Sequence, residues 1–122
     1  MGAFTDKEEE LIRLLSSMEI SRNVARTLVC LQAQEECTSV QIERATGLRQ
    51  PEVSIAIQEL RDRGWVAKKD IRRSRKGRPV HNYRLARPFA EIIAVIDAGE
   101  KSRIRKMEQA LGRLRALVKK SG

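Results

Sequence analysis

The sequence predicts a mainly α-helical domain with a two-stranded β-hairpin, followed by a further helical segment. Helix-capping signatures precede several segments whose apolar residues recur every three or four positions, the period of an amphipathic helix. The period changes at Trp65, and a second extended stretch follows at residues 81–85, which indicates two strands. Because 122 residues suffice for one domain and an appended helix, we expect a domain over residues 1–87 and a helical segment over residues 88–122.

The first two predicted helices both follow capping residues. Thr5 and Glu8 form a capping box, so a helix begins there and runs to about residue 18. Ser21 caps a second helix, which ends near Gln34 where the apolar pattern breaks. The side chains expected to face inward from these helices are Leu11, Leu14, Leu15, Met18, Val24, Leu28 and Leu31, whereas Arg22 and Arg26 are expected to face solvent.

The next two predicted helices are short and separated by a tight turn. Thr38 and Gln41 repeat the capping pattern, and Gly47 ends the third helix because glycine tolerates the left-handed conformation. Pro51 fits the first turn of a fourth helix, which ends at Gly64. This is the helix-turn-helix arrangement, in which the first helix supports the second so that its N-terminal turn projects into the major groove of DNA. The expected inward residues are Ile42, Ala45, Leu48, Val53, Ile57 and Leu60.

Polar side chains on the fourth helix, which we call the recognition helix, suit base reading. Gln50 and Gln58 can read adenine edges, and Ile55 can contact a thymine methyl group. Glu52 either accepts a hydrogen bond from a cytosine amine or balances the helix dipole, and the dipole role is favoured. The predicted DNA-contacting residues of this helix are Arg49, Gln50, Pro51, Ser54, Ile55 and Gln58.

The net charge of +9 is concentrated in the hairpin, which we call the wing (residues 65–85), and in the C-terminal tail. Residues 68–87 hold nine basic residues and one acidic residue, which indicates a polyanionic partner rather than a general solubility charge. A solvated hairpin without a partner is the alternative, and mutual repulsion of its charges disfavours it. Trp65 and Tyr83 are expected to pack the wing against the core. The residues expected on phosphates or in the minor groove are Lys69, Arg72, Arg73, Arg75, Lys76 and Arg78.

The segment after Pro88 is predicted to pair two copies of the chain. It contains two apolar stripes, with Gly99 placed to bend or interrupt the helix between them. Residues of the second stripe are spaced 3, 4, 3, 4, as are the a and d positions of a coiled coil. The expected dimer interface consists of Phe89, Ile92, Ile93, Ile96, Ile104, Met107, Leu111, Leu114 and Val118.

Several classes of site are not expected. Two cysteines and one histidine are too few for a disulfide framework or a four-ligand zinc site, so we expect neither metal nor cofactor. Cys30 is expected to be a buried hydrophobe and Cys37 an exposed thiol, with a redox role as a minor alternative. There is no nucleophile–base pair and no phosphate-cradling glycine loop, so we do not expect an enzyme. The sequence shows no secretory signal and no membrane span, so we expect a soluble cytoplasmic protein.

Residues 38–66, TSVQIERATGLRQPEVSIAIQELRDRGWV, resemble the winged helix-turn-helix of MarR-type and TrmB-type transcription regulators of archaea and bacteria. The matching features are the polar cap, Ala45-Thr-Gly-Leu48 at the turn, and Leu60-x-x-x-Gly64-Trp-Val at the end of the recognition helix. The wing matches as Lys-Lys-Asp, Arg-Lys-Gly-Arg-Pro and Tyr-Arg-Leu, so the resemblance covers residues 20–87. The C-terminal helices are similar in kind to the dimerisation helices of such families.

The resemblance implies a homodimer that binds double-stranded DNA sequence-specifically at a promoter. We expect it to be a repressor rather than an activator. The chain is too short for the large effector domain of sugar-sensing TrmB-type proteins. Two alternatives keep the fold: a non-specific architectural or RNA-binding winged helix, and a protein-interaction module in a larger assembly. The operator, any small-molecule effector and the role of the basic C-terminal tail are left open.

Overall fold

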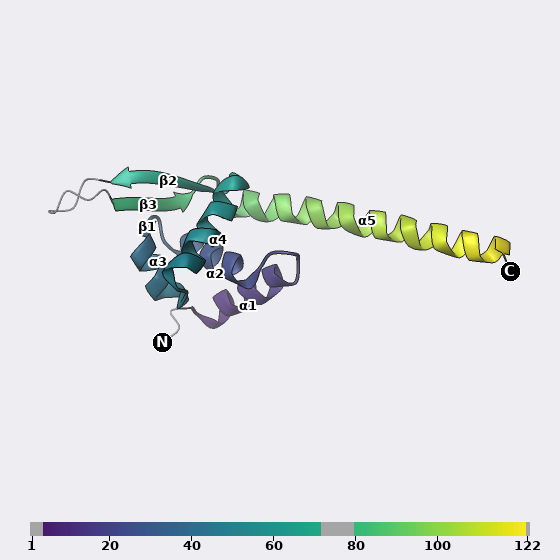
Figure 1. The fold of residues 1–122 in the computed structure, drawn as a ribbon, viewed down its shortest axis with the longest axis horizontal. Helices are drawn as coiled ribbons and strands as arrows, with labels where there is room; N and C mark the ends of the chain where they lie inside the picture. Colours follow the sequence, from purple (N-terminus) through teal and green to yellow (C-terminus); the bar gives the residue numbers. More distant parts are fainter. Residues whose placement is uncertain (1–3, 72–79, 122) are drawn as a thin grey trace. The chain divides into compact units, whose positions relative to one another are not determined.

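A computed structural model describes residues 4–71 and 80–121 (Figure 1). The chain divides into two compact units, Met1–Phe89 and Ala90–Gly122. The prediction of a mainly helical chain with a small antiparallel sheet is confirmed. The elements are α1 (Asp6–Ser16), α2 (Arg22–Ala33), β1 (Cys37–Thr38), α3 (Ser39–Thr46), α4 (Gln50–Asp62), β2 (Val66–Ile71), β3 (Val80–Leu85) and α5 (Phe89–Ser121).

Hydrogen bonds confirm the predicted N-terminal caps of α1 and α3. At α1, the Thr5 hydroxyl accepts from the Glu8 amide at 3.1 Å, and the Glu8 carboxylate accepts from the Thr5 amide at 2.8 Å. Thr38 and Gln41 repeat this reciprocal pair at α3. Gly47 follows α3 with a φ of 76°, a left-handed conformation in which an L side chain is strained. These short-range contacts set where the helix-turn-helix begins and turns.

The core of the first unit is built around α2, which contacts α1, α3 and α4. Apolar residues cover most of the circumference of α2, so this helix can be surrounded on several sides. Leu28 is completely buried, and burial of one such side chain contributes roughly 1.5–3 kcal/mol. The other helices contribute Ile12, Ile42, Val53, Ile57 and Leu60 to the same core.

Two side chains of the first helices do not lie as predicted. Leu14 was expected inside but is 52% exposed, and Ile12 is buried with Leu15 instead. The buried face of α1 is therefore rotated from the predicted stripe. Arg26 was expected in solvent but is half-buried, with its guanidinium 5.9 Å from the centre of the Phe4 ring.

The sheet has three antiparallel strands in the order β1-β3-β2, one more than predicted. The additional strand β1 pairs Cys37 with Tyr83 and Thr38 with Asn82. Two residues are too short a run to show the alternation of a strand, so the sequence pattern does not reveal β1. Because β1 lies against β3, Cys37 is buried, and the expectation of an exposed Cys37 was wrong.

The C-terminal unit consists of one helix, α5. Gly99, which was expected to bend or interrupt it, does not interrupt it. One ion pair spans this residue and another follows it: Lys101 Nζ is 3.0 Å from Asp97 Oδ2, and Arg103 Nη2 is 2.9 Å from Glu100 Oε1. One glycine costs a helix about 1 kcal/mol relative to alanine, which good helix-forming neighbours and side-chain pairs can offset. Among the described residues there is no helix of the length and apolarity needed to span a membrane.

Candidate nucleic-acid interface

The recognition helix α4 has two chemically distinct faces. Val53, Ala56, Ile57 and Leu60 are buried, and α4 contacts α2, α3 and β2. Side chains pointing the other way are exposed along the length of the helix. The structure thus brings together on one exposed surface the six predicted DNA-contacting residues of this helix: Arg49, Gln50, Pro51, Ser54, Ile55 and Gln58.

Hydrogen bonds divide the polar residues of this surface by how firmly they are held. Glu52 accepts from the Arg49 backbone amide at 2.8 Å and so completes the N-terminal cap. This contact agrees with the favoured dipole role of Glu52. The Gln50 amide reaches the Ser54 hydroxyl only at 3.4 Å, near the limit for such a bond. Gln50 is therefore held weakly and can reorient toward a base edge.

Two aliphatic side chains of the helix-turn-helix are exposed. Ile55 is 69% exposed on α4, as its predicted contact with a thymine methyl group requires. Val40, near the start of α3, is 51% exposed and was not singled out from the sequence. Its position two residues before the buried Ile42 places it on the outer side of α3, which is the signal that could have identified it.

On the wing, basic side chains lie on both faces of the strands. Lys69 is exposed opposite Asn82, and the alternation of a strand places it on the same face as the exposed Arg84. Lys68 lies on the other face, opposite Tyr83. Arg84 and Lys68 were not among the predicted contacts, although the same alternation would have indicated them. The predicted contacts Arg72, Arg73, Arg75, Lys76 and Arg78 lie outside the described residues.

The base of the wing is attached to the helical core, as predicted for Trp65. This side chain is 4% exposed, and the Arg63 guanidinium lies 5.0 Å from its ring centre. Its amide donates to the Leu60 carbonyl at 3.0 Å, and its carbonyl accepts from the Ala86 amide at 2.8 Å. Tyr83 is half-buried on the central strand. Both aromatic residues are therefore placed for packing rather than for stacking on bases.

The two cysteines are buried neighbours and poor candidates for a reactive site. Burial, with a smaller contribution from the adjacent Cys37, raises the pKa of the Cys30 thiol to about 12. Burial also raises the pKa of Cys37, whose thiol donates to the Gln34 side-chain carbonyl at 3.1 Å. Because the thiolate is the reactive form, both thiols are kept in their unreactive state.

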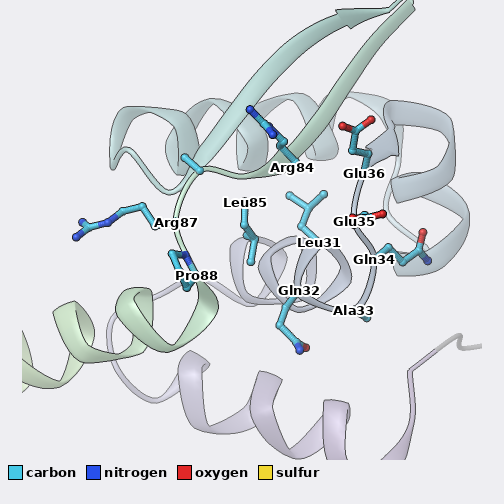
Figure 2. Close-up of a pocket in the computed structure, with 11 residues that line it drawn as sticks. Leu31, Gln32, Ala33, Gln34, Glu35, Glu36, Arg84, Leu85, Arg87 and Pro88 are labelled. Atoms are coloured by element: carbon cyan, nitrogen blue, oxygen red, sulfur yellow. The ribbon is translucent and has the colours of Figure 1, made fainter.

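An open groove that the sequence does not predict lies where α2 ends and β3 leads into α5 (Figure 2). Its volume is about 820 Å³, and both acidic and basic side chains line it. No motif signals the groove, because its two walls come from segments about fifty residues apart in the chain. Its lining consists of residues 31–36 and 84–88, including Glu35, Glu36, Arg84 and Arg87.

In the C-terminal unit, the two predicted apolar stripes differ in exposure. Ile92 is buried in the single chain, and Phe89, Ile93 and Ile96 are half-buried. Each residue of the second stripe is at least 49% exposed, and Leu117, which was not predicted, is 47% exposed. The second stripe thus presents the uncovered apolar surface: Ile104, Met107, Leu111, Leu114 and Val118.

The family model of the MarR family matches residues 19–77, just under half of the chain. No curated protein sequence matches. Among solved structures, the archaeal chromatin protein TrmBL2 aligns at 16% identity with a TM-score of 0.66, over 91% of this chain and 40% of its own. A possible transcriptional regulator from Methanosarcina mazei Go1 aligns at 12% identity with a TM-score of 0.66, over 86% of each chain.

A MarR family transcriptional regulator from Silicibacter pomeroyi is also similar, at 19% identity with a TM-score of 0.55, over 95% of this chain and 82% of its own. At these identities the structural likeness establishes the fold. The MarR family consists of transcription regulators rather than enzymes, in agreement with the prediction that the chain is not an enzyme. The resemblance seen in residues 38–66 is thereby confirmed.

Proposed function

Because residues 19–77 carry the winged-helix domain of the MarR family, we propose that the protein is a transcription regulator that binds a specific DNA sequence. In this proposal α4 enters the major groove, and the wing contacts the phosphate backbone or the minor groove. The protein acts as a homodimer through α5, and it acts as a repressor. Occupation of a promoter is sufficient for repression, whereas activation needs a further contact with the transcription machinery.

The observation that carries this proposal is the exposed surface of α4. Gln50 and Gln58 offer amides that can pair with adenine, and Ile55 offers an apolar contact for thymine. These side chains project from the outer face of a helix whose other face is fixed in the core by Val53 and Leu60. A rigid helix with base-reading side chains at its N-terminal end supports sequence-specific binding.

Charge supports the DNA partner independently of the recognition helix. The strands of the wing carry Lys68, Lys69 and Arg84 in exposed positions, and the sequence between them adds five further basic residues. Each phosphate that such residues neutralise adds about 0.9 to the slope of log affinity against log salt. We therefore expect the affinity for any duplex to fall steeply as the salt concentration rises. Base reading by α4 would add a sequence-specific contribution to this affinity.

A second candidate function is an architectural role without sequence preference. TrmBL2, to which this chain is similar in fold, is described as a chromatin protein with a novel mode of DNA binding. The same basic wing would serve a protein that contacts the DNA backbone alone. The two functions differ in whether α4 reads bases.

Selection of bound duplexes from a random pool tests the proposal. The expected result is an enriched motif whose affinity exceeds that of bulk competitor DNA by a factor of about 10³ or more at physiological salt. A two-fold symmetric motif would also support the homodimer. A ratio near one, with tight binding to every duplex, would replace the regulator by the architectural function.

Variants of the wing separate both DNA functions from the protein-interaction alternative. Reversal of charge at Arg72, Arg73 and Arg75 should weaken binding to all duplexes alike and lower the salt slope. The matched control reverses Arg113, an exposed arginine of α5, and should leave DNA binding unchanged if the C-terminal tail does not contact DNA. Unchanged binding in the triple wing variant would contradict the role proposed for the wing.

A further inference from the structure

The C-terminal part of α5 presents an apolar surface that nothing in the described chain covers. Each described residue after Ser102 is exposed, including six large apolar side chains. In proteins most of the stability of a helix comes from packing of its apolar face rather than from intrinsic propensity, so a covering partner is expected. We propose that α5 pairs with α5 of a second copy in an antiparallel coiled coil centred between Leu111 and Leu114. This inference rests on the homodimer of the proposed function.

In an antiparallel coiled coil, each a position packs against a d position of the partner helix. Ile104, Leu111 and Val118 occupy a positions, and Met107 and Leu114 occupy d positions. With the centre between Leu111 and Leu114, Leu111 meets Leu114 of the partner and Met107 meets Val118 of the partner. The two-fold axis repeats both contacts, which gives four successive apolar layers.

Residues beside the a and d positions agree with this register. Leu117 is 47% exposed at a g position, where a charged residue is usual. Since g positions face one another in an antiparallel pair, Leu117 lies against Ala110 of the partner, a large residue against a small one. On the opposite side, the e positions bring Glu108 against Arg115 of the partner, so the two-fold axis creates two ion pairs. Neither charge has an ion-pair partner among the described residues of its own chain.

A parallel pair fits the same residues less well. Continuing the heptad toward the N-terminus places Asp97 at an a position and Glu100 at a d position. A parallel pair would set each of these carboxylates against its own copy, immediately beside the apolar layers. An antiparallel register shifted to include Ile93 would bury Asp97 and Glu100 against leucines.

The antiparallel pair determines where the two DNA-binding units are attached. At 1.5 Å per residue, the two Phe89 positions at which α5 begins lie about 70 Å apart, at opposite ends of the pair. A parallel pair would attach both units at the same end.

Disulfide trapping in the full-length protein distinguishes the two orientations. Val118→Cys alone should not cross-link under mild oxidation, because the two copies of this position lie roughly 17 Å apart along the antiparallel pair. The double variant Met107→Cys/Val118→Cys should give covalent dimers, and the wild-type chain should not because Cys30 and Cys37 are buried. Covalent dimers of Val118→Cys alone would establish the parallel orientation and overturn the proposal, as would a monomer by sedimentation at micromolar concentration.

A charge exchange tests the register itself. Glu108→Arg and Arg115→Glu should each weaken dimerisation about fivefold, the effect of losing two exposed ion pairs, and the double exchange should restore it. Arg113→Glu is the matched control, because its c position faces away from the partner, and it should leave dimerisation unchanged. Failure of the double exchange to restore pairing would exclude this register. These measurements need no DNA, so a lack of sequence-specific DNA binding would leave them unaffected.

Discussion

Replacement of Gln50 by alanine should change which base sequence the protein prefers while leaving its fold intact. The side chain is exposed, and its amide makes one long hydrogen bond, 3.4 Å to the Ser54 hydroxyl. Loss of such a contact at the surface changes the free energy of unfolding by less than about 0.5 kcal/mol. A bidentate glutamine–adenine pair contributes about 1–3 kcal/mol of discrimination, or roughly 5- to 150-fold in relative affinity at each half-site.

The assay compares dissociation constants for the enriched duplex and for duplexes substituted one base pair at a time. Wild-type protein should discriminate at the position that Gln50 reads, and Gln50→Ala should bind all four bases there with similar affinity. Gln32→Ala is the matched control, since Gln32 is an exposed glutamine that lines the groove in Figure 2 rather than the outer face of α4. Unfolding followed by Trp65, the single buried tryptophan, checks the fold. If Gln50→Ala keeps the wild-type preference at every position, the assignment of Gln50 to base reading is wrong.

Three further predictions concern stability and reactivity. Gly47→Ala should lower the free energy of unfolding by about 1–2 kcal/mol, because its φ of 76° strains an L residue. Gly99→Ala in α5 should instead raise the stability of the helix by up to about 1 kcal/mol. Circular dichroism during denaturation measures both effects, and equal effects of the two variants would refute the argument. Leu28→Ala should cost about 3 kcal/mol in the same assay because the side chain is fully buried, and a cost below 1 kcal/mol would mean that the core rearranges. Burial raises the Cys30 pKa from 9.0 to about 12, so the stability that the neutral thiol contributes is present below pH 9 and is lost as the pH rises toward 12. Cys30 and Cys37 should accordingly react with a thiol reagent at pH 8 only as fast as the domain opens, and labelling as rapid as in denaturant would show that they are accessible.

The site could be predicted from the sequence as far as its interactions are local. The cap of α3 joins Thr38 to Gln41, and the turn depends on the conformation of Gly47 alone. The outer face of α4 follows from the period of its buried residues, so the exposed position of Gln50 could be inferred without tertiary contacts. The basic character of the wing is likewise a property of the sequence.

Features that depend on segments distant in the chain could not be predicted. Cys37 is buried because β1 pairs with β3, which brings it opposite Tyr83. The groove beside α2 forms from two segments that share no sequence pattern. Leu14 and Ile12 both fit an apolar stripe on α1, and only the packing of α1 against α2 selects the face that contains Ile12.

The sequence by itself determined the order of helices and strands, the helix ends and the location of the basic charge. The reason is that hydrogen bonds of capping residues and the period of a helix act over three or four residues. The tertiary structure decided which apolar side chains are covered: on α1 it buries Ile12 and leaves Leu14 exposed. Burial depends on which segments meet in space, and the apolar period along one helix carries no such information.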